Sequence, residues 1–238
     1  MSKRKIIRTV KKIRIMRTLN KTVQSNLTPA TALELLQHGN ERFVGNLRAH
    51  RNLLEQVNET KEGQWPFAAI VSCMDSRTSA ELIFDQGLGD IFSIRLAGAV
   101  ISDNVLGSLE YACKVAGSKI IVVLNHTHCG AIKGACDGVE MGNLTGLLGK
   151  IRPAVFQEKT FKENRNSKNH DFVDAVANIH TERSVQAILE QSAILADLIN
   201  SGEVGIIGAM YDVETGVVTF HEHTKRVGQP LQVAEKSA

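Results

Sequence analysis

Long apolar runs are missing from this chain. No stretch approaches the roughly 20 consecutive apolar residues that a membrane span needs, although 43% of the 238 residues are hydrophobic. Cysteine is also sparse, and only Cys73, Cys113, Cys129 and Cys136 are present. This density excludes the disulfide scaffold of a small secreted protein and favours free or metal-bound thiols in a reducing compartment.

The body of the chain also lacks an excess of basic charge. The net charge is +3, but residues 1–22 carry nine Lys or Arg and no acid, so the rest has 19 basic and 25 acidic residues. The body therefore gives no charge support for nucleic-acid or membrane binding. No apolar h-region follows the basic start, which argues against a secretory signal. We expect a cytoplasmic protein and leave organellar targeting by the basic N-terminus open.

Charge and helix-start signals divide the chain into three parts. Residues 1–27 form a basic arm that we expect to be disordered or a targeting segment. A folded domain is expected over 28–225, beginning where Thr28 can cap a helix and Pro29 suits its first turn. Residues 226–238 are expected to be a tail.

Short apolar runs alternate with helical patterns through this domain. Buried strands are predicted at Phe67–Cys73, Ile91–Leu96, Lys119–Leu124 and Val204–Met210. Helices are predicted at Thr78–Gln86, Asp103–Ala116 and within 176–202. Nearly continuous apolar strands that alternate with helices predict an α/β fold, with a central, mostly parallel sheet flanked by helices.

Several local signals refine this outline. Thr78 and Glu81 have the spacing of a capping box, and Asp103 can cap the next helix. Residues 154–170 are polar and are expected to be irregular. A turn at Gly216 can return Val217–Phe220 antiparallel to the residues around Tyr211.

Soft metal ligands follow two of the predicted strands. Cys73 ends the first strand, and His126 and Cys129 follow the third. Side chains gather beyond the carboxyl ends of parallel strands, so these three are expected to meet. Two thiolates and one imidazole suit Zn²⁺, and three protein ligands leave the fourth position for water, as in catalytic sites.

The two motifs around these residues resemble the beta class of carbonic anhydrases. The first motif is C-x-D-S-R at Cys73–Arg77, and the second is H-x-x-C-G at His126–Gly130. The similarity runs from about Thr28 to His223. It implies a zinc lyase that reversibly hydrates carbon dioxide to bicarbonate and a proton by attack of zinc-bound hydroxide, with one Zn²⁺ per chain.

The resemblance also implies a role for each matching residue. Cys73, His126 and Cys129 match the zinc ligands, and Asp75 and Arg77 match a catalytic ion pair. Substrate-binding positions match Gln64, Phe92, Tyr111 and the Gly130 amide, and Ala97 can help line a dry pocket for carbon dioxide. Tyr111 is expected to act across a subunit interface, so a homo-oligomer of at least two chains is implied, with dimer and tetramer both open.

Two departures from the family pattern leave alternatives open. Leu96 stands where many members have Asn, and Ile70 stands where members inhibited by non-catalytic bicarbonate have Trp. Hydrolysis of carbon disulfide or carbonyl sulfide, which are linear like carbon dioxide, is one alternative. A zinc-stabilised interaction protein without catalysis is another, against which Asp75, Arg77 and Gln64 argue.

Overall fold

The computed structural model describes residues 18–228. Its helices are α2 (Lys21–Ser25), α3 (Pro29–Val44), α4 (Leu53–Thr60), α5 (Ala80–Ile83), α6 (Asp103–Glu110), α7 (Gly130–Cys136), α8 (Gly142–Gly149), α9 (Arg152–Gln157), α10 (His170–Gln191) and α11 (Ala193–Asn200), with a 3₁₀ turn η1 (Ala97–Ala99) and a π-helical turn η2 (Tyr111–Val115). Its strands are β1 (Ala68–Ser72), β2 (Ile91–Arg95), β3 (Ile120–His126), β4 (Gly205–Tyr211) and β5 (Val218–Arg226). Most of the expected basic arm and of the expected tail lies outside the described residues.

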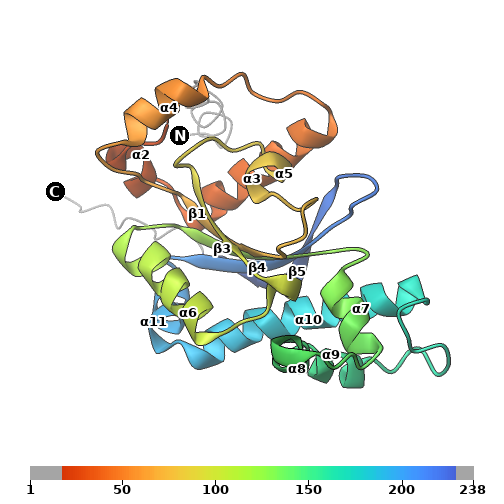
Figure 1. Ribbon diagram of the computed structural model, residues 1–238. Coiled ribbons are helices and arrows are strands. Elements are labelled where there is room, and N and C mark those ends of the chain that lie inside the picture. The colour runs from red at the N-terminus through yellow and green to blue at the C-terminus, as the bar shows by residue number, and fades with distance from the viewer. Residues whose placement is uncertain (1–17, 229–238) are drawn as a thin grey trace.

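One sheet organises the described residues. Its strand order is β2-β1-β3-β4-β5, with the first four strands parallel and β5 antiparallel to β4. Helices α3, α4 and α5 lie on one face, and α6 to α11 lie on the other (Figure 1). The predicted α/β fold with a mostly parallel sheet is confirmed, as is the antiparallel return through Gly216, where Tyr211 pairs with Val218.

The central strands are buried on both faces. Ala68 and Ile70 of β1 contribute to the core beneath α3 and α5, whereas Ala69 and Val71 contribute to the core beneath α6 and α11. Every residue of β1, β3 and β4 is buried. Burying a Val or Ile side chain stabilises a fold by about 1.5–3 kcal/mol, so these runs fix the sheet and its carboxyl edge.

Helix boundaries differ from the sequence predictions where a polar side chain bonds elsewhere. The predicted capping box at Thr78 is wrong, because the Thr78 hydroxyl donates to the carbonyls of Cys73 and Asp75, and α5 begins only at Ala80. The long helical pattern over 176–202 divides into α10 and α11, because the Ser192 hydroxyl accepts from the Leu195 amide and starts a new helix. Residues 154–170 are partly helical, since α9 extends to Gln157.

Ordered structure begins before Thr28. Helix α2 lies in the segment expected to be an arm, and Gln24 on it is buried. Its side-chain amide donates to the carbonyls of Pro66 and Ala116, both at 2.8 Å, and so fastens this helix beside the start of β1. The expected cap and first turn at Thr28 and Pro29 are confirmed.

Candidate functional site

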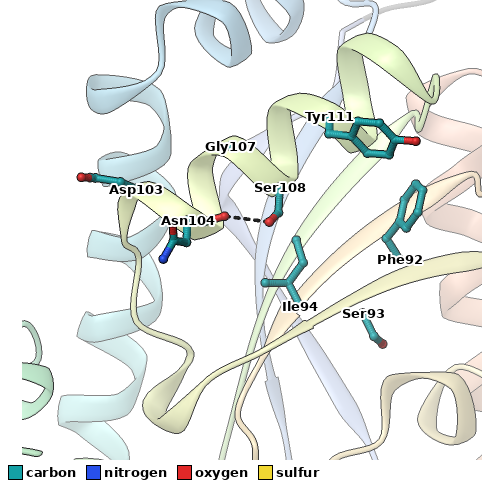
Figure 2. A pocket seen from close by; sticks show the side chains of 8 residues that line it. All are labelled: Phe92, Ser93, Ile94, Asp103, Asn104, Gly107, Ser108 and Tyr111. Carbon is teal, nitrogen blue, oxygen red and sulfur yellow. Dashed lines mark hydrogen bonds between the residues drawn. The ribbon is translucent and has the colours of Figure 1, made fainter. Parts of the chain in front are cut away.

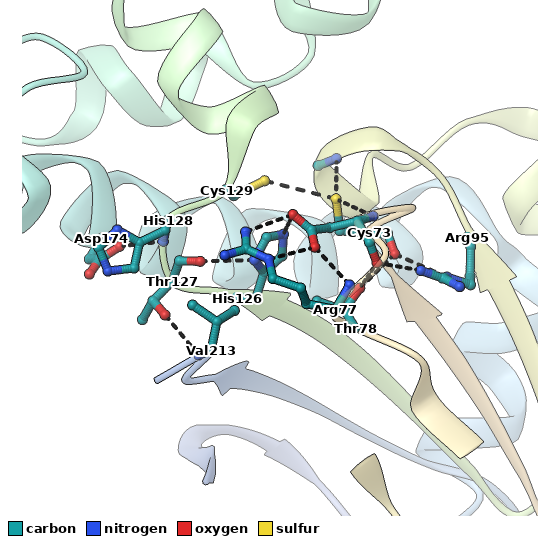
Figure 3. Close-up of polar contacts among 12 residues, drawn as sticks. Cys73, Arg77, Thr78, Arg95, His126, Thr127, His128, Cys129, Asp174 and Val213 are labelled. Atoms are coloured by element: carbon teal, nitrogen blue, oxygen red, sulfur yellow. Dashed lines mark hydrogen bonds and ion pairs between the residues drawn. The ribbon is translucent and has the colours of Figure 1, made fainter. Parts of the chain in front are cut away.

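The predicted soft ligands meet at the carboxyl edge of the sheet. Cys73 follows β1, His126 is the last residue of β3, and Cys129 caps α7. Parallel pairing of Ser72 with Leu124 brings the two strand ends side by side. The sulfurs of Cys73 and Cys129 are 3.9 Å apart, and one ligand atom from each of the three residues lies within 4.8 Å of the others (Figure 3). All three side chains are buried.

His126 presents an unprotonated nitrogen to this group. Its Nδ1 lies 2.9 Å from the Thr127 carbonyl oxygen. A carbonyl can only accept a hydrogen bond, so Nδ1 carries the proton and Nε2 keeps a free lone pair. Among the described residues, this buried Nε2 has no hydrogen-bond partner. An orphaned imidazole nitrogen beside two thiols is a donor set that fits Zn²⁺.

Hydrogen bonds favour an anionic sulfur at this position. The contact with the Cys129 sulfur lowers the pKa of Cys73, burial opposes this, and the backbone amides of Asp75 and Gly98, each 3.4 Å from Cys73 Sγ, lower it further. The pKa of Cys129 is raised, because the first thiolate and burial disfavour a second negative charge. A divalent cation removes this conflict, since it favours both thiolates together.

Asp75 and Arg77 form a close ion pair beside the three ligands. Arg77 Nε donates to Asp75 Oδ1 at 3.0 Å, and Nη2 donates to Oδ2 at 2.8 Å. These hydrogen bonds hold the pKa of the Asp75 carboxyl well below its usual range, whereas partial burial opposes them. Asp75 Oδ2 lies 4.0 Å from His126 Nε2, so an ionised carboxylate stands at the edge of the metal-ligand group.

Two further side chains shape the loop that carries Cys73 and Asp75. Arg95 donates from Nε to the Cys73 carbonyl at 3.2 Å and from Nη2 to the Asp75 carbonyl at 2.5 Å. Thr78 donates to the same two carbonyls from the other side. The backbone of the first motif is therefore fixed by the side chains of Arg95 on β2 and of Thr78, two residues before α5 (Figure 3).

Gly98 links Cys73 to helix α10, and this role was not predicted from the sequence. Its amide nitrogen lies 3.4 Å from Cys73 Sγ, and its φ of 66° is in the left-handed region. A Cβ at this position would lie 2.7 Å from Ile151 Cδ1. Its carbonyl accepts from Nε2 of buried His180, 2.9 Å away. The A-G pair after β2 was visible in the sequence, but the contact of Gly98 with His180 on α10 was not.

Two of the predicted pocket residues, Ala97 and Gly130, lie near the ligand group, as does Leu96. Ala97 begins η1, next to Gly98, and Leu96 packs against the apolar clusters on both sides of it. Gly130 is exposed and opens α7, where first-turn amides have no acceptor within the helix. The Gly130 amide is thus positioned next to Cys129 with its donor available.

The other predicted pocket residues are not brought to the ligand group within one chain. Gln64 precedes β1 and is exposed at the opposite end of that strand from Cys73. Phe92 and Tyr111 make an edge-to-face contact with ring centroids 6.2 Å apart, and they line a surface hollow of about 440 Å³ beside edge strand β2 (Figure 2). Tyr111 is 55% exposed.

His128 points to other partners than the ligand group. Its ring nitrogen Nε2 lies 3.2 Å from Glu214, its amide donates to Asp174 at 3.4 Å, and its ring packs edge-on against His170. It has a positive φ of 58°, so the turn between β3 and α7 directs this side chain away from its neighbours His126 and Cys129.

Comparison with known proteins agrees with this geometry. A family model described as carbonic anhydrase matches residues 68–218. Carbonic anhydrase 2 of Mycobacterium tuberculosis is 34% identical over 212 residues, which cover 87% of this chain and 99% of the relative. A carbonic anhydrase of Mycolicibacterium smegmatis is 32% identical and covers 86% of this chain and 98% of its own.

Solved structures show the same fold. A beta-carbonic anhydrase of Aspergillus fumigatus has a TM-score of 0.63 at 20% identity and covers 84% of this chain and 92% of its own. One of two tetrameric beta-carbonic anhydrases from Sordaria macrospora has a TM-score of 0.60 at 22% identity, with coverage of 81% and 92%.

The chain therefore belongs to the carbonic anhydrase family, in its beta class. This class carries out zinc-dependent hydration of carbon dioxide, and the group Cys73, His126 and Cys129 is compatible with a zinc site. Among the described residues, no helix is both long and apolar enough to span a membrane.

Proposed function

We propose that Cys73, His126 and Cys129 hold the zinc ion of this carbonic anhydrase and that Asp75 and Arg77 act beside it. The observation that carries the proposal is the buried convergence of three donor atoms within 4.8 Å, one of them the unpaired Nε2 of His126. When bound, zinc lowers the pKa of a water molecule, so that hydroxide is available near neutral pH.

Asp75 would orient the attacking oxygen. Arg77 keeps the carboxylate ionised and uses only part of its acceptor capacity, since each carboxylate oxygen can accept two hydrogen bonds. Asp75 can therefore accept a hydrogen bond from the O–H of the attacking hydroxide and orient its lone pair toward the carbon of carbon dioxide. Arg77 also holds Asp75 away from the position that the nucleophile needs.

A backbone amide would bind the substrate oxygen, and apolar side chains would line the rest of the substrate pocket. Negative charge develops on a carbon dioxide oxygen as the new C–O bond forms, and the Gly130 amide is a fixed donor for it. Carbon dioxide is small and apolar, so a dry wall beside the nucleophile serves it better than several hydrogen bonds. Ala97 and Leu96 supply that wall from the turn after β2.

The remaining pocket residues would come from a second chain. Gln64, Phe92 and Tyr111 lie away from Cys73 in their own chain, and the Phe92–Tyr111 hollow is open at the β2 edge. We propose that these residues complete the pocket of a neighbouring subunit in a homo-oligomer of at least two chains. The tetrameric relative from Sordaria macrospora supports assembly in this fold.

A reducing location is proposed for the protein. All four cysteines are free thiols in the structure, and thiolate ligands need a compartment that keeps them reduced. The cytoplasm meets this need.

Stopped-flow measurement of carbon dioxide hydration at about pH 8 tests the function. Zinc-loaded protein should hydrate carbon dioxide far faster than the zinc-free control, and Asp75→Asn should lose most of this activity while it keeps zinc. Equal rates for loaded and zinc-free protein would refute hydration. Sulfide release from carbonyl sulfide, measured on the same sample, separates the alternative substrates.

A further inference from the structure

A second group of metal-binding side chains lies away from the Cys73 site. It consists of Glu182 on α10 and of His221 and His223 on β5, and one ligand atom from each lies within 4.8 Å of the others. β5 is the last strand of the sheet, and His221 pairs with Gly208 in the middle of β4. The group therefore lies beside the body of the sheet, whereas the Cys73 group lies at its carboxyl edge.

The group is already assembled by contacts between the strand and the helix. His223 Nε2 lies 2.8 Å from Glu182 Oε1, and the rings of His221 and His223 are stacked with centroids 5.5 Å apart. The stacked rings show that the two histidine side chains lie on the same side of β5. Bringing an ion to these residues would thus require no rearrangement of the backbone.

A bulge in β5 fixes the position of the two histidines. The register between β4 and β5 shifts between Ile206 and Gly208, whose partners are Arg226 and His221. Thr224 closes this bulge, because its hydroxyl accepts from the Gly208 amide at 2.9 Å and donates to the His221 carbonyl at 2.8 Å. Bulges of this kind re-aim side chains near functional sites.

His221 has a ring nitrogen without a hydrogen-bond partner at the buried side of the group. It is only 9% exposed, and its buried Nδ1 has no hydrogen-bond partner among residues 18–228. His223 and Glu182 have side chains that are 63% and 40% exposed, so an ion can reach the group from solvent.

Neighbouring cations are directed elsewhere. Arg183 and Arg226 line the hollow of about 320 Å³ that Glu182 and His223 also border. Arg183 donates to Gln157 at 3.1 Å, and Arg226 donates to the Lys225 carbonyl at 3.0 Å. Their charge weakens attraction of a cation at a distance, but neither guanidinium occupies the carboxylate of Glu182 in these contacts.

We propose that Glu182, His221 and His223 form a second, surface metal site for a divalent transition ion such as Zn²⁺ or Co²⁺. A donor set of two imidazoles and one carboxylate favours such transition ions, whereas Ca²⁺ and Mg²⁺ prefer sites made of oxygen ligands alone. The bound ion would join edge strand β5 to α10. Helix α10 in turn bonds β3 through Thr181 and Asn125, at 3.0 Å, so the second ion would stabilise the fold around the sheet.

The test adds Co²⁺ to full-length protein that already holds about one zinc per chain. Calorimetry should find one further Co²⁺ per chain, and the absorption spectrum should lack thiolate-to-cobalt charge-transfer bands, because this site contains no sulfur. The melting temperature should rise with Co²⁺ concentration, as for any ligand that binds only the folded state. His223→Ala should weaken this binding by roughly tenfold or more, since one of three ligands is lost.

His38→Ala is the matched control. His38 and Glu41 form a pair with the same 2.8 Å His–carboxylate distance, but among the described residues they belong to no three-ligand group. This variant should bind Co²⁺ as the original protein does. Glu182→Gln, which keeps the shape of the side chain, should weaken binding as His223→Ala does. Unchanged Co²⁺ binding in His223→Ala, thiolate charge-transfer bands, or no second ion at millimolar Co²⁺ would each overturn the proposal.

Discussion

Arg77 binds Asp75 through its own backbone as well as its guanidinium. The Arg77 amide donates to Asp75 Oδ1 at 2.9 Å, in addition to the two side-chain hydrogen bonds. Asp75 Oδ2 meanwhile lies 4.0 Å from His126 Nε2. The same carboxylate is thus within reach of both the guanidinium and the metal-ligand group, and Arg77 decides between them.

Replacing Arg77 with Ala should release Asp75 toward the metal. The freed carboxylate competes with water there, and hydroxide competes better as pH rises. We expect hydration to fall by roughly 10²-fold near neutrality, with zinc retained and with a smaller deficit at higher pH. Hydration rate, zinc content and X-ray absorption on one preparation measure this.

Two companion variants define that result. Arg77→Lys keeps the charge but not the two-pronged hydrogen bond, so it should also be impaired. Arg152→Ala removes a surface guanidinium 3.6 Å from Glu140 and should behave as the original protein. A zinc-loaded Arg77→Ala enzyme with full activity both near neutrality and at higher pH would refute the proposed role of the Asp75–Arg77 ion pair.

The zinc content of Cys→Ser variants should distinguish the cysteine ligands from the other cysteines. Cys73→Ser should lose zinc and activity together, because a hydroxyl does not replace a thiolate ligand. Cys113→Ser should keep about one zinc per chain, since Cys113 lies apart from the ligand group and burial raises its pKa to about 12. Elemental analysis after dialysis measures both, and stoichiometric zinc in Cys73→Ser would remove Cys73 from the ligand set.

His180 should make stability depend on pH. Burial lowers its pKa to about 4 from 6.5. Above pH 6.5 the imidazole is neutral in both states, but between pH 6.5 and 4 only the unfolded chain takes up the proton. Stability should therefore fall as pH drops through this window, by roughly 3 kcal/mol from this group.

His180→Phe tests that dependence. At pH 7 it should lower the free energy of unfolding by about 1–3 kcal/mol, because the Gly98 carbonyl loses its donor. Its stability should then decline less steeply between pH 6.5 and 4 than that of the original protein. Urea unfolding over this range gives both values, and parallel pH curves would count against the assignment.

Gly98→Ala should disturb the metal centre through the turn whose amide contacts Cys73. The new Cβ would lie 2.7 Å from Ile151 Cδ1 at a residue with φ 66°, so Ile151 or the turn must shift, and a shift of the turn would weaken the contact of its amide with Cys73. We expect weaker zinc retention and a loss of about 1–3 kcal/mol in stability. Gly146→Ala, with nothing within 4 Å of its Cβ in helix α8, should be neutral or stabilising. Equal behaviour of the two variants would contradict this.

Gln24→Ala should show that the structured domain begins before Thr28. The half-buried Ala116 carbonyl would lose the Gln24 donor, and the buried Pro66 carbonyl would keep only the Ser118 hydroxyl, at a cost of about 1–3 kcal/mol. Gln186→Ala removes one exposed contact with Glu190 and should change stability little. Denaturant unfolding of both variants makes the comparison.

The metal centre could be predicted because its parts follow from strand periodicity. Cys73 and His126 stand where buried apolar runs end, and parallel strands end at one edge. Asp75 and Arg77 are two residues apart, so their contact is local. Thr78 was misassigned because its hydroxyl can reach backward to Cys73 as easily as forward into a helix.

Other features depend on contacts between residues distant in sequence, which local sequence patterns do not predict. Gln24 lies in the segment expected to be an arm, and its burial accompanies hydrogen bonds to the carbonyls of two residues distant in sequence. His180 reaches Gly98 only because α10 crosses behind the turn after β2. Gln64, Phe92 and Tyr111 have no metal-centre contact in their own chain, so no single-chain reasoning could have tested their placement.

The ligand group also has a consequence for the newly made chain. Cys73 and Cys129 are 56 residues apart in sequence, and the segment between them includes β2 and α6. Their sulfurs meet only after β1 and β3 have paired, and such distant parallel pairings form slowly. Until then no preassembled site captures the metal, and both thiols are exposed to oxidants. The time the sheet takes to assemble therefore sets the period in which oxidative damage competes with maturation of the enzyme.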